Sequence, residues 1–417
     1  MKICAIICEY NPFHYGHLRN MQEAKEKSKA DAVMCILGGN FTQRAEPAIA
    51  NKYVRATMAL EAGADIVVQL PTAYACSSAE IFALAGVKIA NSFSNVTHLA
   101  FGCESENHAI LQEVASYLAK EPKEYKEALA KYLELGNSMV LSRQKAIEEL
   151  IKNGKAQFSQ ITETMELLQK PNNILAIEYL KALINTDSKI EPVFITRGES
   201  EHHSEDVNGK DTSATAIRAR LQKSEKVKKI KKLVPKSTYN ILKEEIKTFG
   251  LPDQELFNNL CMYVLKTSTA EDYLKVFDIN EGLENRFVEA CKDIKDLNDL
   301  LLEVKSKRYT YTRLKRIVLR MLLGIQKDVI ESIYSIDKLP YIKVLGFNSE
   351  NNTLLSEVNA NTNLIIRNSN VVEKPSKLYK ELAAIEDRSN VVYNLLLKKS
   401  KGTPKYSPDL LTKTIKL

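Results

Sequence analysis

The sequence lacks any hydrophobic run that approaches the roughly 20 residues needed to cross a bilayer. We also expect no cleavable leader, because the apolar run at residues 2–8 is short, ends at Glu9 and has no small-residue cleavage site. No internal repeat or low-complexity segment is evident. These absences exclude a membrane-spanning or repeat architecture, and we expect a soluble protein without a membrane partner.

Paired cysteines are also missing. The seven cysteines are scattered and form no Cys-x-x-Cys motif, which indicates buried thiols in a reducing cytoplasm. Hydrophobic residues make up 44% and charged residues 27% of the 417 residues, which is ordinary for a globular chain of two or three domains. The net charge of +7 permits a polyanionic partner without requiring one.

The first two hundred residues alternate short apolar runs with helical patterns. The runs predict strands at residues 3–8, 32–37, 65–70, 96–101 and 192–196, with helices at 18–28, 52–61 and 77–92 between them. Near-continuous apolar strands that alternate with helices predict a parallel sheet covered on both faces. We therefore expect an α/β fold with a doubly wound, Rossmann-like sheet.

The rest of the chain is richer in helices. Residues 105–169 predict a helical insertion, with amphipathic helices at 111–120 and 125–135. We expect a catalytic domain over residues 1–222 and a basic, mainly helical C-terminal region over 223–417. Possible strands at 341–345 and 363–367 mean that this region is not purely helical.

The strongest functional signal is the string Glu9-Tyr-Asn-Pro-Phe-His14-Tyr-Gly16-His17, directly after the first strand and at the start of a helix. Ligands of doubly wound sheets bind beyond the carboxyl ends of the strands, and a helix N-terminus offers N–H groups to an anion. Two histidines fixed there can stabilise the charge that develops during nucleotidyl transfer. A loop-and-cap role is the alternative reading. Zinc binding is disfavoured because His-x-x-His lacks further ligands at suitable spacing, so we predict no metal site.

The motifs around this string resemble those of a known family. His14-x-Gly16-His17 is similar to the signature of the HIGH-type nucleotidyltransferase superfamily. The whole string resembles the bacterial tRNA(Met) cytidine acetate ligase family. Further matching motifs follow in order over about 220 residues: Gly38-Gly-Asn-Phe-Thr-Gln-Arg44, Glu46-Pro-Ala-Ile49, Gln69-Leu-Pro71, Phe101-Gly-Cys-Glu104, Pro171-Asn-Asn-Ile-Leu175, Ile177-Glu-Tyr179 and Ser213-Ala-Thr-Ala-Ile-Arg218. The chain departs from the pattern at Ala45 and Ala176, where we expect glycine, and at Cys103, where we expect serine.

The resemblance implies an activity. It implies that ATP and acetate give acetyl-adenylate and pyrophosphate, and that the acetyl group then passes to the wobble cytidine of elongator tRNA(Met), giving N4-acetylcytidine. Mg²⁺ is expected with the ATP phosphates, and no obligate protein partner is evident. Residue chemistry alone supports ATP-dependent adenylyl transfer. A small-molecule adenylyltransferase and a non-catalytic RNA-binding protein on the same scaffold therefore remain alternatives.

Three side chains are the catalytic candidates: His14, His17 and Arg44. Arg44 and its neighbour Gln43 follow the second strand and could hold the acyl substrate or a phosphate, although Arg44 could instead pair with Glu46 on the surface. Lys52 and Arg55 lie one helical turn apart and could face the same crevice or form a solvated helix face.

The expected ATP contacts come from five segments. Gly102 leaves room for adenine or ribose, and the Ser213–Arg218 helix start offers hydroxyls and amides to phosphates. The resemblance adds Arg197 and one asparagine of the pair Asn172 and Asn173. The full predicted set is Ile7, Cys8, Glu9, Tyr10, Asn11, Pro12, Phe13, His14, Tyr15, Gly16, His17, Leu18, Arg19, Asn20, Gly102, Asn172, Asn173, Arg197, Ser213, Thr215 and Arg218.

Three basic clusters predict a nucleic-acid partner. Residues 223–236 carry seven lysines against one acid, residues 305–320 interleave seven cations with Tyr309 and Tyr311, and the tail adds four lysines between 398 and 405. Clustered cations bind phosphates, and aromatic rings can stack on unpaired bases. Solvated helix faces are the alternative. We predict tRNA contacts at Lys228, Lys229, Lys231, Lys232, Lys307, Arg308, Arg313 and Arg316.

Overall fold

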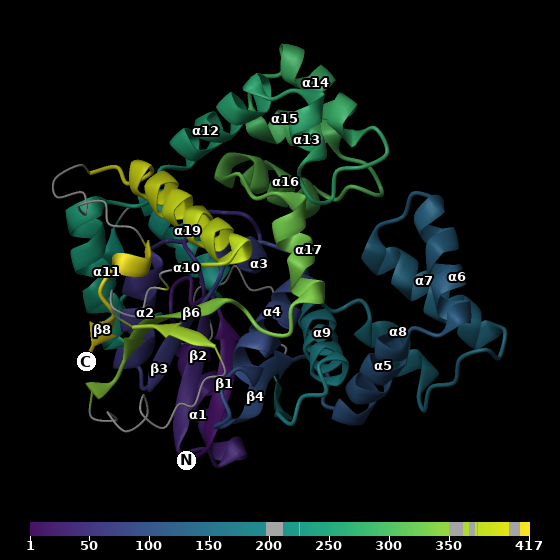
Figure 1. Cartoon of the computed structure of the whole chain (residues 1–417). Coiled ribbons are helices and arrows are strands. Elements are labelled where there is room, and N and C mark those ends of the chain that lie inside the picture. The colour runs from purple at the N-terminus through teal and green to yellow at the C-terminus, as the bar shows by residue number, and fades with distance from the viewer. Residues whose placement is uncertain (197–211, 225, 350–361, 367–371, 373, 400–408) are drawn as a thin grey trace.

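The structure is a computed structural model that describes the chain except residues 197–211, 225, 350–361, 367–371, 373 and 400–408 (Figure 1). Within the described residues eight strands form one sheet in the order β5-β4-β1-β2-β3-β6-β7, with β8 beside β6. The first five strands are parallel, whereas β6 is antiparallel to β3. Their bounds are β1 Ile3–Cys8, β2 Ala32–Gly38, β3 Ile66–Leu70, β4 Val96–Cys103, β5 Glu191–Thr196, β6 Tyr341–Phe347, β7 Asn363–Ile365 and β8 Ile415–Lys416.

The parallel strands are apolar on both sides because helices cover both faces of the sheet. Along β1, Ile3 and Ala5 belong to one core cluster, while Cys4 and Ile6 belong to the other. One face carries α1, α2, α10 and α11, and the other carries α3, α4 and α9. Each of the five predicted N-terminal strands is present, so the doubly wound α/β prediction is confirmed. The helices of these two layers are α1 Tyr15–Ser28, α2 Lys52–Glu61, α3 Thr72–Ala75, α4 Ala79–Asn91, α9 Pro171–Asn185, α10 Ala214–Ser224 and α11 Lys236–Phe249.

The predicted helical insertion lies between β4 and α9. In Figure 1, α6 and α7 stand away from the sheet, while α5 approaches it. Its inner residues Ile110, Leu111 and Val114 are fully or almost fully buried, which anchors the insertion to the main core. Its helices are α5 His108–Lys120, α6 Lys123–Glu134, α7 Met139–Lys152 and α8 Ile161–Leu167.

The C-terminal region is mainly helical, as expected, but it also completes the sheet. Strand β6 pairs with the edge of β3, with Val67 opposite Gly346, so segments 1–222 and 223–417 share one sheet. In Figure 1 the helices α12–α16 lie above the carboxyl ends of the parallel strands, and α19 crosses between them. The remaining elements are η2 Val227–Ile230, α12 Gln254–Thr267, α13 Ala270–Leu274, α14 Leu283–Asp293, α15 Leu297–Val304, α16 Tyr311–Leu323, α17 Lys327–Ser335, α19 Lys377–Leu395 and η5 Asp409–Leu411.

A buried ionic cluster ties the C-terminal region to α2. The Lys52 ammonium lies 3.2 Å from a Glu386 oxygen and 2.6 Å from an Asp409 oxygen, and all three side chains are almost completely buried. Thr72 at the start of α3 donates its backbone N–H and its hydroxyl to Glu386. The Lys52 charge keeps the pKa of Asp409 below its ordinary value despite burial.

Arg55 is buried as well, and it binds backbone carbonyls. Its guanidinium donates to the carbonyl groups of Glu9, Gly38, Gly39 and Ala50, and so holds the loops after β1 and β2 together. Both sequence readings of Lys52 and Arg55, as crevice residues and as a solvated face, are therefore wrong. The physical reason is that carboxylates and carbonyls distant in the sequence satisfy their charges inside the protein.

All seven cysteines are buried and unpaired, as the sequence predicted. Burial raises the pKa of the Cys4 thiol to about 11, so this side chain is a neutral core residue near pH 7. Among the described residues, no helix combines the length and the apolar character that crossing a membrane requires.

The contact between α2 and α11 contains a carboxyl group that destabilises the protein when it ionises. Asn51 caps α2 and donates its side-chain N–H to Glu245 at 3.3 Å, and burial raises the pKa of Glu245 to about 7. The folded protein holds this proton more tightly than the unfolded chain, so stability falls as pH rises from about 4.5 to about 7. Glu245→Gln should therefore increase stability at pH 8 by about 1–2 kcal/mol and flatten its decline across this pH window.

Urea unfolding at pH 4.5 and pH 8 measures this effect. Glu244→Gln is the matched control, because Glu244 is an exposed neighbour on α11 that pairs with Lys247. If the free energy of unfolding depends on pH equally in wild type and Glu245→Gln, the raised pKa of Glu245 does not cause the decline in stability.

Candidate active site

The topology places a ligand site beside β1. The chain winds from β1 to β2 and β3 in one direction, and β4 and β5 lie on the other side of β1. Ligands of such sheets bind at this reversal, beyond the carboxyl ends of the strands. A cavity of about 230 Å³ lies there, lined by Ile6, Ile7, Cys8, Glu9, Tyr10, Asn11, His17, Asn20, Gln43, Phe82, Ala100, Phe101, Gly102, Asn172, Leu175, Tyr179, Ala214 and Arg218.

The two motif histidines form a stacked pair at the start of α1. Their ring centroids are 3.7 Å apart. His14 is the N-cap of α1, and its Nδ1 accepts the Gly16 backbone N–H at 3.0 Å, while Nδ1 of His17 accepts the His14 backbone N–H at 3.3 Å. A neutral imidazole that accepts at Nδ1 carries its proton on Nε2. Local backbone geometry therefore makes both rings Nε2–H donors, the form needed to stabilise a phosphate.

Aromatic neighbours fix the orientation of His17. Phe13 is fully buried, and its ring meets Tyr10 edge-on at 4.8 Å between centroids. The His17 ring packs against both, at 4.9 Å from Tyr10 and 5.7 Å from Phe13. Phe13 thus supports the catalytic candidate without lining the cavity, whereas Tyr10 does both.

Arg218 supplies a positive charge to the same cavity. It projects from α10, donates to the Asn11 carbonyl at 2.8 Å and lies 3.2 Å from the Thr215 hydroxyl. Burial lowers the pKa of Arg218, and the charges of Glu46 and Glu9 oppose that effect. A half-buried guanidinium held by neutral oxygens favours an anion at the cavity, because the anion would offset the cost of removing the charge from water.

The loop after β2 brings Gln43, but not Arg44, to the cavity. Ala45 has the left-handed φ of 58°, and its N–H closes a turn onto the Thr42 carbonyl at 2.8 Å. Arg44 lies at the tip of this turn, where it is exposed and does not line the cavity. The left-handed backbone also explains why glycine is the residue expected at position 45.

Two neighbouring asparagines have different positions. Asn172 lines the cavity and donates to a Glu104 carboxylate oxygen at 2.6 Å. Asn173 is buried, and its oxygen accepts the backbone N–H groups of Glu104 and Ser105, so it fixes the turn after β4. The geometry therefore favours Asn172 as the nucleotide contact of the pair.

Only part of the predicted phosphate-binding start of α10 lies at the cavity. Ala214 and Arg218 line the cavity, whereas the Ser213 hydroxyl accepts the Ala216 N–H at 3.2 Å as a helix cap. Thr215 is exposed beside Arg218. Arg197 lies outside the described residues.

The cavity contains about half of the predicted ATP contacts. Ten of them line it: Ile7, Cys8, Glu9, Tyr10, Asn11, His17, Asn20, Gly102, Asn172 and Arg218. Other described members support the loop or lie beside it: Pro12, Phe13, His14, Tyr15, Gly16, Leu18, Arg19, Asn173, Ser213 and Thr215. Sequence reasoning missed an apolar part of the lining, namely Phe82, Phe101, Leu175 and Tyr179. Three of these belong to the motifs that carry the family resemblance, and only Phe82 in α4 has no sequence signal.

The cations of the second basic cluster are largely engaged inside the protein. Arg308 pairs with Glu281, Arg313 lies 3.3 Å from Asp278, and Arg316 donates to the Gln43 carbonyl at 3.1 Å. Burial lowers the pKa of Arg316 to about 10. Lys307 is exposed.

Tyr309 is only 4% exposed and donates its hydroxyl to Asn280, so the suggestion that it stacks on bases is wrong. The physical reason is that its ring is needed in the packing of the helices. In contrast, Lys228, Lys229, Lys231 and Lys232 around η2 are all exposed.

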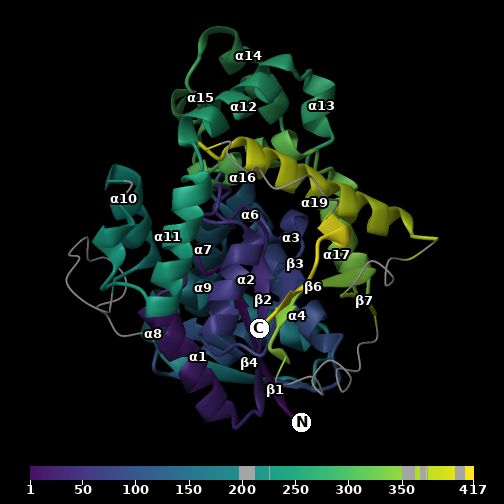
Figure 2. The ribbon, with the colours of Figure 1, turned by 90° about the vertical axis from the view of Figure 1, so that its left-hand side faces the viewer.

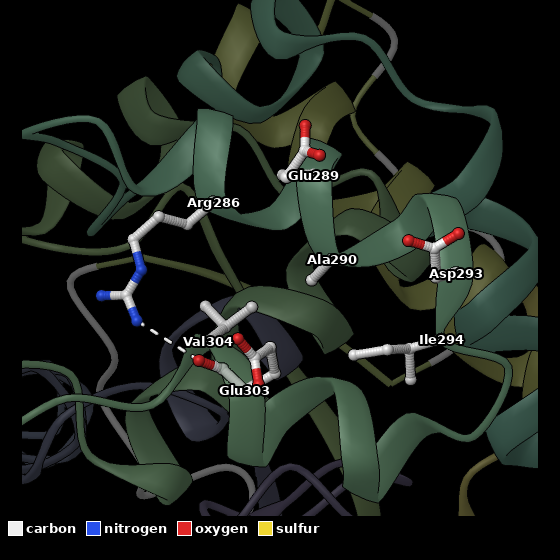
Figure 3. Close-up of a pocket in the computed structure, with 7 residues that line it drawn as sticks. All are labelled: Arg286, Glu289, Ala290, Asp293, Ile294, Glu303 and Val304. Carbon is white, nitrogen blue, oxygen red and sulfur yellow. Dashed lines mark hydrogen bonds between the residues drawn. The ribbon is translucent and has the colours of Figure 1, made fainter.

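A second hollow lies between α14 and α15, remote in the sequence from the site. It is lined by Arg286, Glu289, Ala290, Asp293, Ile294, Glu303 and Val304. Figure 3 shows the Arg286 guanidinium turned toward the Glu303 backbone carbonyl, at 3.3 Å, rather than toward Glu289 or Asp293. In the described part of the chain, no cluster of three or more His, Cys, Asp or Glu side chains could hold a metal ion.

The sheet order, the histidine pair on the first turn and the cation at α10 together define a HIGH-type nucleotidyltransferase. The family model described as HIGH Nucleotidyl Transferase matches residues 1–407. Solved structures agree in fold. Thermotoga maritima TmcAL bound with alpha-thio ATP aligns over 100% of both chains with a TM-score of 0.89 at 27% identity. Its apo form aligns over the same share with a TM-score of 0.91.

Similar curated proteins indicate which family of HIGH-type nucleotidyltransferases the chain belongs to. The chain is 37% identical to the tRNA(Met) cytidine acetate ligase of Alkaliphilus metalliredigens and 38% identical to that of Caldicellulosiruptor saccharolyticus, over 95% of each chain in both cases. It is 34% identical to the enzyme of that name from Clostridium novyi over the full length of both. The chain belongs to the tRNA(Met) cytidine acetate ligase family.

Proposed function

We propose that this protein activates acetate with ATP and acetylates the wobble cytidine of elongator tRNA(Met). The observation that carries the proposal is the stacked His14–His17 pair, with both Nδ1 atoms bonded to backbone N–H groups beside the cavity at the sheet reversal. The family membership and the alpha-thio ATP of the similar structure support a nucleotide in that cavity.

The first step is adenylate formation. An acetate oxygen attacks the α-phosphorus of ATP, and the bond from that phosphorus to pyrophosphate breaks. Negative charge grows on the α-phosphate and the leaving pyrophosphate. The Nε2–H groups of His14 and His17, the N-terminus of α1 and the Arg218 guanidinium are placed to stabilise this charge, so no covalent enzyme intermediate is needed.

The second step transfers the acetyl group. The exocyclic amine of the cytidine attacks the acetyl carbonyl carbon, the bond to AMP breaks, and the amine loses a proton.

Mg²⁺ would arrive on the phosphates of ATP, because the described residues contain no cluster of protein ligands for it.

Two assays test this function. ATP–pyrophosphate exchange should depend on acetate, and mass spectrometry should find N4-acetylcytidine in tRNA(Met) incubated with protein, ATP and acetate. Exchange with a different acid and no RNA product would indicate a small-molecule adenylyltransferase. Binding of tRNA without any exchange would indicate a non-catalytic protein. Either result would overturn the proposal.

The lysines around η2 are the best exposed candidates for tRNA phosphates. They follow the C-terminal end of α10, the helix whose N-terminal residues Ala214 and Arg218 line the cavity. Replacing Lys228, Lys229, Lys231 and Lys232 with alanine should weaken tRNA binding and lower the magnitude of the slope of log K against log salt by about 0.7–0.9 for each lost phosphate contact. Binding isotherms from 50 to 200 mM salt measure both effects.

The control for this variant removes the same charge elsewhere. Lys120, Lys123, Lys126 and Lys131 are exposed on α5 and α6, and their replacement with alanine should leave the salt slope closer to that of the wild type. Equal slopes for the wild type and the η2 variant would remove this segment from the interface.

A further inference from the structure

We propose that the acetate subsite lies where Gln43 meets the apolar part of the cavity, and that the Gln43 side-chain amide holds the carboxylate. This inference rests on the proposed function and deepens it, because it names the side chain that selects the acid. An unused donor, an apolar wall and the reactivity that the attacking acetate oxygen must keep all favour this subsite.

The unused donor is Nε2 of Gln43. This atom is buried and has no hydrogen-bond partner among the described residues, although Gln43 lines the cavity. Buried polar groups are almost always bonded, so a buried free donor at a ligand cavity points to a ligand acceptor. The backbone of Gln43 is held on both sides. Its N–H donates to a Glu9 carboxylate oxygen at 2.6 Å, and its carbonyl accepts from Arg316 at 3.1 Å. These two bonds fix the backbone from which the donor projects.

The apolar wall comes from three elements of the same cavity. Phe82 of α4, Leu175 and Tyr179 of α9, and Phe101 of β4 line it, and the rings of Phe101 and Tyr179 are 5.2 Å apart. None of these four residues belongs to the predicted nucleotide contacts, whose polar groups come from the β1–α1 loop, Asn172 and α10. A donor that shares one cavity with such a wall fits a ligand with one carboxylate and one methyl group.

An amide is also the donor type that this chemistry needs. The acetate oxygen must keep its lone pairs free to attack phosphorus, and a bidentate arginine pair would hold both oxygens strongly. Arg44, the arginine that the sequence offered for this role, is exposed outside the cavity. A single neutral N–H can orient the carboxylate and leave the attacking oxygen reactive.

Gln43→Met tests the donor because it keeps the length of the side chain and removes the amide. We expect the KM for acetate in ATP–pyrophosphate exchange to rise about 10- to 100-fold, with the KM for ATP within about twofold of the wild type. Thr42→Val is the matched control. It removes the hydrogen bond from the Thr42 hydroxyl to the Glu46 carbonyl in the same loop without altering the cavity lining, and it should leave the KM for acetate nearly unchanged.

Phe82→Ala tests the wall independently of the loop. It should enlarge the subsite, so that the preference for acetate over propionate, as a ratio of kcat/KM values, falls about tenfold or more. Saturation-transfer NMR of acetate on the protein with a non-hydrolysable ATP analogue gives a binding readout that does not require turnover. The Gln43→Met variant should weaken that signal, and thermal unfolding should confirm that both variants are folded.

The outcomes separate the subsite from the function. If wild type exchanges with acetate but Gln43→Met keeps its KM, or Phe82→Ala keeps its selectivity, the subsite is overturned and the proposed function stands. If wild type shows no exchange with acetate, the proposed function itself fails.

Discussion

Replacing His17 with alanine is expected to slow adenylate formation about 100- to 1,000-fold while tRNA binding changes little. The reason is local. The ring lies against Tyr10 and Phe13 at the cavity, and its Nδ1 accepts the His14 N–H, so its Nε2–H is a fixed donor at the place where phosphate charge develops. Truncation removes this donor and leaves the sheet untouched. Pre-steady-state formation of acetyl-adenylate, followed by quench and chromatography, measures the rate directly.

Two further variants separate donation from packing. His17→Gln places an amide N–H near the position of the lost Nε2–H and should recover part of the rate, whereas alanine should not. His98→Ala is the matched control. His98 lies on β4 near Glu191, toward the amino end of the strand and away from the cavity, so its loss should leave adenylate formation nearly unchanged. Full activity of His17→Ala would remove the histidine pair from the mechanism.

Replacing Lys52 with methionine is expected to destabilise the folded protein by about 3–5 kcal/mol, because it removes the ammonium that pairs with two carboxylates buried together. Glu386 and Asp409 both lie within 3.2 Å of the ammonium, and neither can reach water. Urea unfolding at pH 7 measures the loss. The penalty should shrink as pH falls, because protonation of either carboxyl group removes their repulsion.

The double variant Lys52→Met, Asp409→Asn should be more stable than Lys52→Met alone, since only the Glu386 carboxylate of the original pair then remains. Lys120→Met on the surface of α5 controls for the loss of a lysine as such. A Lys52→Met protein as stable as the control would show that the buried cluster contributes nothing to stability.

The sheet could be predicted from the sequence because its strands are buried on both faces. Near-continuous apolar runs such as residues 32–37 and 65–70 leave little choice of structure, and β1 begins and ends at the predicted residues. The strand pairing, in contrast, could not all be predicted from the sequence. No local feature of residues 341–345 predicts that they pair with β3, because that pairing joins segments far apart in the sequence.

The positions of the site residues were likewise predictable only where they depend on neighbouring sequence. His17 and Gly102 come from the segments at the ends of β1 and β4, so their place at the cavity follows from the sheet. Arg44 could not be excluded without knowing the turn that exposes it. Lys52 and Tyr309 read as surface or RNA-facing residues because Glu386, Asp409 and Asn280, which bind them, lie elsewhere in the chain.

The pairing of β6 with β3 has a consequence for synthesis on the ribosome. Strand β3 is made early, but β6 follows roughly 270 residues later, so at about 5–20 residues per second the edge of β3 waits some 15–50 s for its neighbour. During that time the nascent chain exposes an apolar edge of the kind that joins other chains. Factors that shield emerging polypeptides should therefore matter more for the yield of this enzyme than for its finished stability.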